Sequence, residues 1–354
     1  MRPLKTGLTV LDAGRATPGF TLYSPLWRKV TYLLDMDGKI VHQWELPGCP
    51  GGYARLLPNG NLFYSTHTES GPPFPGGASG GLMREVDWDG NVIMEVRDDW
   101  QHHDCRRLEN GNVLYAAWEE MPEDATKKVV GGVEGSEFEG RIFNDLLREV
   151  TPGGETVWEW HAYPDMEVEN YPIHPLTGRR VFAWCNTCCP LPGGDVLIIL
   201  RQINLVGIID RESKRFKYER QNLEWGHPHD AKMLENGNIL MFANGMNTTA
   251  AHPHSYITEF DPKTNETVWE YKSDPTTFFY SHHISGCERL ESGNTLICEG
   301  SFGRVFEVTP DGEIVWEFIN PDFDKMFMGE TVNWVFRAFR YAESSPEING
   351  RVKL

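Results

Sequence analysis

Three short segments of the chain carry histidines in pairs, and their imidazoles are the side chains best suited to chemistry near neutral pH. The segments read HHD at 102–104, HPHD at 227–230 and HHIS at 282–285. A neutral imidazole can act as a base, a nucleophile or a metal ligand. Counted back from the leucine of the turn phrase that follows each segment, His103 and His229 are equivalent, and His227 and His283 share another position. We therefore expect these histidines to gather at one site, with a scaffold role as the alternative.

Other residue types are expected at the same site. Asp104 and Asp230 each follow one of these histidines, and a carboxylate there can fix an imidazole tautomer, ligate a metal or simply cap a turn. His67 ends a strand that should return to the same end of the fold, and aromatic side chains such as Trp118 suit a ring-shaped substrate. The predicted substrate-binding residues are His67, His227, Arg304, Arg337, Trp118 and Asn244.

The elements that must position these residues are repeated hairpins. One phrase places a Gly-centred turn between alternating apolar residues: LLPNGNLFY at 56–64, RLENGNVLY at 107–115, PLPGGDVLI at 190–198, MLENGNILM at 233–241 and RLESGNTLI at 289–297. Asn-Gly in this setting is the strongest short hairpin signal, because both residues accept positive φ. A second hairpin phrase follows each first one, as in REVTPGGETVWEW at 148–160. Two hairpins together predict a four-stranded antiparallel blade.

The arrangement of these phrases predicts a closed ring. Five blades are complete, whereas 32–46 is a second-type hairpin without a partner before it and 332–342 is a first-type strand without one after it. Joining about 20–46 to 331–342 makes a sixth blade and removes the exposed edges of an open sheet. We therefore predict an all-β, six-bladed β-propeller with four-stranded blades, forming one domain over 1–354. The strand that enters each turn should be innermost, with its start at one mouth of the central channel.

Composition limits the classes of partner. The net charge of −18 would repel nucleic acid and anionic lipid, so we expect the protein to bind neither. The apolar run at 196–200 is far shorter than the roughly 20 residues of a membrane span. No signal-peptide pattern opens the chain, and the odd number of cysteines, 7, favours free thiols in a reducing compartment. We expect a cytoplasmic protein; the sequence indicates no oligomeric state.

The quoted phrases resemble a known family. HHDCRRLENGN, HPHDAKMLENGN, HHISGCERLESGN, TPDGEIVWEF and NWVFRAFRY are similar to phrases of the bacterial arylsulfotransferase-like proteins, and the resemblance covers roughly 30–342. It implies transfer of a sulfuryl group from an aryl sulfate to a phenol without a nucleotide cofactor, acting on a small aromatic substrate. It also implies that His283, or the adjacent His282, is the nucleophile, with His103 and His229 in support.

The resemblance is incomplete at one position, and two other functions stay open. The family's arginine after the blade-four turn is replaced by Met246 and Asn247, so Arg201, Arg304 or Arg337 would have to serve instead. One alternative is a divalent metal site (Mn, Fe, Zn or Ni) for lyase, isomerase or hydrolase chemistry. Its expected ligands are His103, His227, His229 and His283. The other alternative is a non-catalytic binding propeller that holds a partner on its rim.

Overall fold

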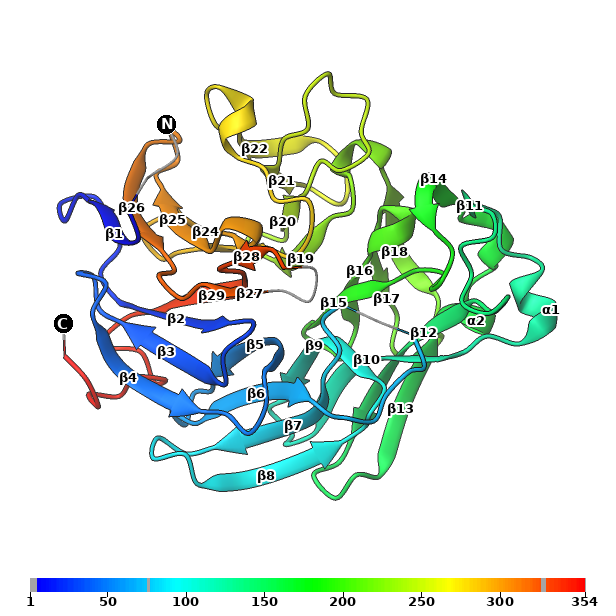
Figure 1. The fold of residues 1–354 in the computed structure, drawn as a ribbon, viewed down its shortest axis with the longest axis horizontal. Coiled ribbons are helices and arrows are strands. Elements are labelled where there is room, and N and C mark those ends of the chain that lie inside the picture. Colours follow the sequence, from blue (N-terminus) through cyan, green and yellow to red (C-terminus); the bar gives the residue numbers. More distant parts are fainter. Residues whose placement is uncertain (1–4, 75–76, 326–328, 354) are drawn as a thin grey trace.

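A computed structural model describes residues 5–74, 77–325 and 329–353, and these residues form six four-stranded antiparallel blades around a central axis (Figure 1). Blades one to three are β5 (Pro50–Leu56), β6 (Leu62–His67), β7 (Gly81–Val86) and β8 (Val92–Arg97); β9 (Gln101–Arg107), β10 (Val113–Glu120), β12 (Phe143–Val150) and β13 (Thr156–His161); and β15 (Cys185–Pro190), β16 (Val196–Leu200), β17 (Leu205–Ile209) and β18 (Phe216–Gln221). Blades four and five are β19 (His229–Met233), β20 (Ile239–Ala243), β21 (Tyr256–Phe260) and β22 (Thr267–Tyr271); and β23 (Gly286–Arg289), β24 (Thr295–Glu299), β25 (Arg304–Val308) and β26 (Ile314–Ile319).

Blade six joins the two ends of the chain, as predicted. Its innermost strand is the late β29 (Val335–Tyr341), followed outward by the early β2 (Phe20–Pro25), β3 (Val30–Leu34) and β4 (Ile40–Glu45). The six inner strands β5, β9, β15, β19, β23 and β29 each contact the next around the ring. One strand was not predicted: β1 (Gly7–Leu11) adds a fifth strand to blade five by pairing with β26.

The remaining elements are short and lie in the connections between strands. They are α1 (Glu123–Thr126), β11 (Gly131–Val133), α2 (Ala162–Asp165), η1 (Val168–Asn170), β14 (Ile173–Gly178), η2 (Arg201–Ile203), η3 (Leu223–Trp225), η4 (Thr276–Phe278), η5 (Gly300–Phe302), β27 (Asp324–Lys325) and β28 (Thr331–Val332). Within the described ranges, no helix has the length and apolar character needed to cross a bilayer.

The turn phrase recurs because its last asparagine carries a contact within the blade. The amide nitrogens of Asn61, Asn112, Asn238 and Asn294 each donate to a glutamate of the third strand at 2.7 Å. In blade four this pairs Asn238 with Glu259, while Gly237 takes the φ of +84° that the turn requires. In these four blades the inner hairpin is therefore tied to the outer hairpin by a polar contact that is at least partly buried.

Tryptophans on the outer strands connect neighbouring blades. The indole nitrogen of Trp44 donates to the Asp87 carbonyl at 3.1 Å, and that of Trp316 donates to the Met36 carbonyl at 2.9 Å. Trp158 and Trp269 make the same contact, with the Arg211 and Pro310 carbonyls. Because each acceptor lies in the outer turn of the next blade, these bonds fix neighbouring blades relative to one another.

Candidate functional site

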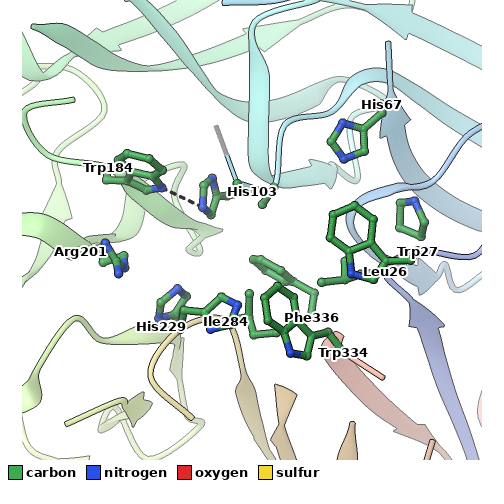
Figure 2. A pocket seen from close by; sticks show the side chains of 14 residues that line it. Leu26, Trp27, His67, His103, Trp184, Arg201, His229, Ile284, Trp334 and Phe336 are labelled. Carbon is green, nitrogen blue, oxygen red and sulfur yellow. Dashed lines mark hydrogen bonds between the residues drawn. The ribbon is translucent and has the colours of Figure 1, made fainter. Parts of the chain in front are cut away.

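A cavity of about 290 Å³ opens at one mouth of the channel, where the inner strands begin (Figure 2). Its apolar lining consists of Leu26, Trp27, Pro50, Gly77, Ala78, Trp184, Ile284, Trp334 and Phe336. Its polar lining consists of His67, His103, Arg201, His229 and His283. No carboxylate is among the described residues that line it. The cavity therefore offers aromatic walls, neutral or basic nitrogen atoms and one guanidinium.

The inner strands of blades two and four pair irregularly near the cavity. Between β9 and β10 the register skips His103 and Asp104, and between β19 and β20 it skips Asp230 and Ala231. His103 and Asp230 consequently have positive φ values of 53° and 54°. Bulges of this kind re-aim side chains at the ends of strands. The sequence positions thus bring the histidines to one mouth, and the bulges decide which of them face the cavity.

His229 is held in a single tautomer. The amide nitrogen of Asn244 donates to the carbonyls of Ser281 (2.7 Å) and Ile284 (3.0 Å), so its oxygen must face the ring. Nδ1 of His229 lies 2.7 Å from that oxygen and 3.0 Å from the carbonyl of His227, and two acceptors there require Nδ1 to carry the proton. Nε2, which has no hydrogen-bonding partner among the described residues, keeps a free lone pair.

His283 lies on the same side of the cavity. Its Nδ1 is 3.2 Å from Oγ of Ser301, and its ring meets the edge of Trp334 with the centroids 4.4 Å apart. Because a serine hydroxyl can donate or accept, this contact does not fix the tautomer as firmly as Asn244 fixes His229. Because the contact with Ser301 is made by Nδ1, the other ring nitrogen of His283 is Nε2. Like Nε2 of His229, it has no hydrogen-bonding partner among the residues described.

His103 differs, because both of its nitrogens are occupied. Nε1 of Trp184 donates to Nε2 of His103 at 3.0 Å (Figure 2), and Nδ1 of His103 lies 2.9 Å from Nδ1 of His102. An indole N–H can only donate, so Nε2 of His103 is the acceptor. The arrangement leaves His103 no lone pair directed into the cavity.

Arg201 is the cation of the cavity. It follows β16 at the start of η2, and Figure 2 shows it between Trp184 and His229. Its guanidinium forms no hydrogen bond or ion pair with any residue in the described ranges. Burial lowers its pKa to about 10, and no acidic neighbour opposes that effect. A half-buried arginine without a counterion is ready to bind an anionic group.

The electrostatics keep the cavity imidazoles neutral. Burial, followed by the charge of Arg201, lowers the pKa of His229 to about 3. Burial together with neighbouring histidines holds the pKa of His103 and that of His283 well below 6.5. Burial also lowers the pKa of His67. At neutral pH these rings are therefore uncharged, and Arg201 supplies the positive charge of the cavity.

A buried ion group closes the channel beneath the cavity. The fully buried guanidinium of Arg337 lies 3.3 Å from a carboxylate oxygen of Asp104 and 3.2 Å from one of Asp230, and donates to the Asn186 carbonyl at 2.7 Å. Asp104 also accepts from Tyr53 and from the Cys188 amide. The Cys287 amide donates to Asp230 at 3.0 Å. These groups come from all six inner strands, so Arg337 has a structural position in the floor of the site.

Comparison with known proteins identifies the family. Residues 53–321 match the family model described as Arylsulfotransferase (ASST). The chain belongs to this family. The match spans most of the chain and includes every inner strand from blade two to blade five. A search of curated proteins by sequence returned no match.

Solved structures are similar in fold but distant in sequence. A protein of unknown function from Bacteroides caccae superposes with a TM-score of 0.57 at 13% identity, covering 92% of this chain and 99% of its own. A streptogramin B lyase gives a TM-score of 0.50 at 12% identity, covering 95% and 93%. Virginiamycin B lyase from Staphylococcus aureus gives 0.43 at 12% identity, covering 76% and 69%. The first two superpositions support the propeller fold, and at these identities they say nothing about the reaction.

Several predicted site residues of this arylsulfotransferase-family chain lie away from the cavity lining. Nε2 of His227 lies 3.0 Å from Oγ1 of Thr177. The exposed His282 lies beside His283, with the two rings tilted and their centroids 4.2 Å apart. Trp118 lies behind the wall, stacked on His102 at 4.0 Å. Arg304 pairs with Glu299 of β24 and Glu317 of β26, at 3.1 and 2.6 Å. Asn244 acts through His229.

The alternative metal ligands do not form a ligand group. Within the described residues no three His, Cys, Asp or Glu side chains are placed to hold one ion. Among the four expected ligands, Nε2 of His103 is taken by Trp184 and Nε2 of His227 faces Thr177. All seven cysteines are free thiols, and burial holds the pKa of Cys185 and that of Cys188 well above 9.0.

Three residues of the site were missed or undervalued in the sequence. Arg201 has no motif around it, and only its place directly after an inner hairpin strand distinguishes it from other arginines. Trp27 comes from the turn after β2, and Phe336 alternates with Arg337 on β29, so that one faces the cavity and the other the floor. The alternation of side chains along β29 could have predicted from the sequence that Phe336 and Arg337 point in different directions. The turn that holds Trp27 carries no comparable sequence signal.

Proposed function

We propose that this protein transfers a sulfuryl group from an aryl sulfate to a phenolic acceptor in the channel cavity. The observation that carries the proposal is the uncompensated guanidinium of Arg201 beside two neutral imidazoles, those of His229 and His283. A cation without a counterion favours an anionic group, and tryptophan walls favour an aromatic ring. Membership of the arylsulfotransferase family supports the same class of reaction.

In the first half of the proposed reaction, Nε2 of His283 attacks the sulfur atom of the donor. The bond between sulfur and the aryl oxygen breaks, and the phenolate leaves with the electron pair of that bond. Arg201 binds the sulfuryl oxygens and offsets their negative charge, as preorganised donors do in a site that excludes water. Ser301 accepts from Nδ1–H of the sulfated ring. The donor is the aryl sulfate itself, so the step needs no nucleotide.

In the second half, the phenolic acceptor replaces the first product. Nε2 of His229 takes the proton of the acceptor hydroxyl while the acceptor oxygen attacks sulfur. The bond between Nε2 of His283 and sulfur breaks, which restores the neutral imidazole. The anionic sulfuryl group beside His229 favours its protonated form during this step, and the proton then leaves to solvent.

The test is a turnover assay with 4-nitrophenyl sulfate and phenol. We expect release of 4-nitrophenolate that depends on the acceptor, with His283→Ala and His229→Ala each lowering kcat by at least about a hundredfold. His252→Ala is the matched control, because that histidine is exposed in the loop after β20 and should leave turnover unchanged. Absence of any acceptor-dependent turnover in the unaltered protein would overturn the proposal.

A further inference from the structure

Trp184 is held both at its backbone and at its indole ring. The backbone amides of Trp184 and Cys185 donate to Asp145 at 2.6 and 2.8 Å. The indole nitrogen of the same tryptophan donates to Nε2 of His103 at 3.0 Å. His103 has a φ of 53° and Trp184 a φ of 57°, conformations that persist only where the surroundings enforce them.

The hydrogen bonds of the histidine pair have one direction. Because the indole can only donate, Nε2 of His103 accepts and Nδ1 of the neutral ring carries the proton. That proton points to Nδ1 of His102 at 2.9 Å, so the His102 proton resides on Nε2. Nε2 of His102 lies 3.3 Å from Oδ1 of Asp145 without forming a hydrogen bond, and the His102 ring is stacked on Trp118 with the centroids 4.0 Å apart.

From the bond between the indole and Nε2 of His103, and from the His102 ring behind it, we propose that His103 is a positioning residue that holds Trp184 as a fixed aromatic wall of the substrate cavity. In this role His103 needs only an acceptor atom at Nε2, and it neither exchanges protons with substrate nor binds a metal. The inference rests on the proposed function only for the nature of the ligand, an aromatic anion. A consequence is that the affinity of the cavity for an aromatic substrate depends on the hydrogen bond between Trp184 and His103.

Two substitutions of His103 separate this role from a chemical one. His103→Gln keeps a side-chain oxygen that can accept from the indole but removes the imidazole, whereas His103→Leu removes the acceptor. We expect His103→Gln to retain kcat and KM within about twofold. We expect His103→Leu to raise KM for 4-nitrophenyl sulfate about tenfold at little-changed kcat, since the net effect of one hydrogen bond is of that size.

A spectroscopic measurement tests the link without any turnover. In protein labelled with ¹⁵N-tryptophan, Trp184→Phe assigns the Trp184 indole signal by its disappearance, and hydrogen exchange then reports the protection of that N–H. Protection should persist in His103→Gln and be lost in His103→Leu, while the other indole signals confirm that each variant is folded. If the proposed function fails, this measurement still decides the inference.

Two results would overturn the inference. The first is a fall of kcat by more than about tenfold in both His103→Gln and His103→Leu, which would make the imidazole itself reactive. The second is equal indole protection in all three proteins, which would show that His103 does not hold Trp184.

Discussion

Oδ1 of Asn244 accepts a hydrogen bond from Nδ1 of His229 at 2.7 Å, and this contact determines which nitrogen of the ring is presented to the cavity. The amide cannot be reversed, because its nitrogen already donates to two backbone carbonyls in the loop before β23. Blade four thus supplies both the imidazole and the group that fixes its proton, while blade five fixes the amide. The free lone pair at Nε2 of His229 is thus set by buried atoms of two blades.

Removing this amide should therefore affect both stability and activity. In Asn244→Ala the carbonyls of Ser281 and Ile284 lose their donor and His229 loses one of its two acceptors, so we expect a loss of about 1–3 kcal/mol in the free energy of unfolding. Turnover should fall further than stability explains, because the ring can then rotate. Urea denaturation and the aryl sulfate assay measure the two effects. Asn170→Ala, on the surface, should change neither; equal behaviour of the two variants would contradict the assignment.

The depressed pKa of His229 predicts a pH dependence of stability. Its pKa is about 3 in the folded protein, below the ordinary 6.5, so the unfolded chain binds one more proton between these values. Stability from this group is complete above pH 6.5 and is lost as pH falls toward 3. The drop in unfolding free energy from pH 7.5 to 5 should be about 2 kcal/mol smaller in His229→Gln than in the unaltered protein. Urea denaturation at both pH values measures this drop in unfolding free energy.

His252→Gln is the control, because that histidine is exposed and its loss should leave the drop unchanged. A drop in His229→Gln equal to that of the unaltered protein would contradict a lowered pKa of His229.

Arg201 should bind the anionic group of the substrate without contributing to the fold. We expect Arg201→Gln to weaken binding of 4-nitrophenyl sulfate by about tenfold to a hundredfold, the effect of losing hydrogen bonds to a charged group. The melting temperature should stay level or rise, because a half-buried charge without a counterion has been removed. Isothermal titration calorimetry and thermal unfolding test both statements. Arg304→Gln, whose guanidinium is paired with Glu299 and Glu317, is the control for binding, and equal affinity in the two variants would count against Arg201.

The ion group beneath the cavity should dominate stability. Arg337→Met leaves the carboxylates of Asp104 and Asp230 buried without their shared partner, and breaking a buried pair in this way costs about 3–5 kcal/mol. Arg97→Met removes an exposed pair with Asp99, which is worth about 0–1 kcal/mol. Guanidinium denaturation of both variants gives the comparison. Similar losses in the two would show that the floor of the channel is not held by Arg337.

The fold could be predicted because its signals are local. Each Asn-Gly hairpin brings its own turn residues, and the split sixth blade shows as an unmatched hairpin and an unmatched strand. The strand β1 could not be predicted in this way, since GLTVL has no turn phrase and pairs with β26 near the other end of the chain. Its place is decided by tertiary pairing that leaves no trace in the neighbouring sequence.

The site was only partly predictable, because register brings residues to the mouth but bulges and alternation choose their direction. His227 and His283 are equivalent in the repeat, yet only His283 lines the cavity, since His227 has a φ of 67° and faces Thr177. Arg337 has the charge expected of a sulfuryl-binding group but alternates with Phe336 and points to the floor. Arg201 lines the cavity from blade three, and no sequence motif around it predicts that position.

The central claim is that a cavity histidine carries the sulfuryl group between donor and acceptor. The most direct test is mass spectrometry of the protein after incubation with 4-nitrophenyl sulfate in the absence of acceptor. We predict the mass increase of one sulfuryl group, placed on His283 by peptide fragmentation, absent from His283→Ala and present in His229→Ala. An adduct on His229 that is still formed in His283→Ala would mean that His229 is the nucleophile and His283 the base. A protein that releases 4-nitrophenolate without ever carrying a sulfuryl group, or that releases none, would contradict the claim.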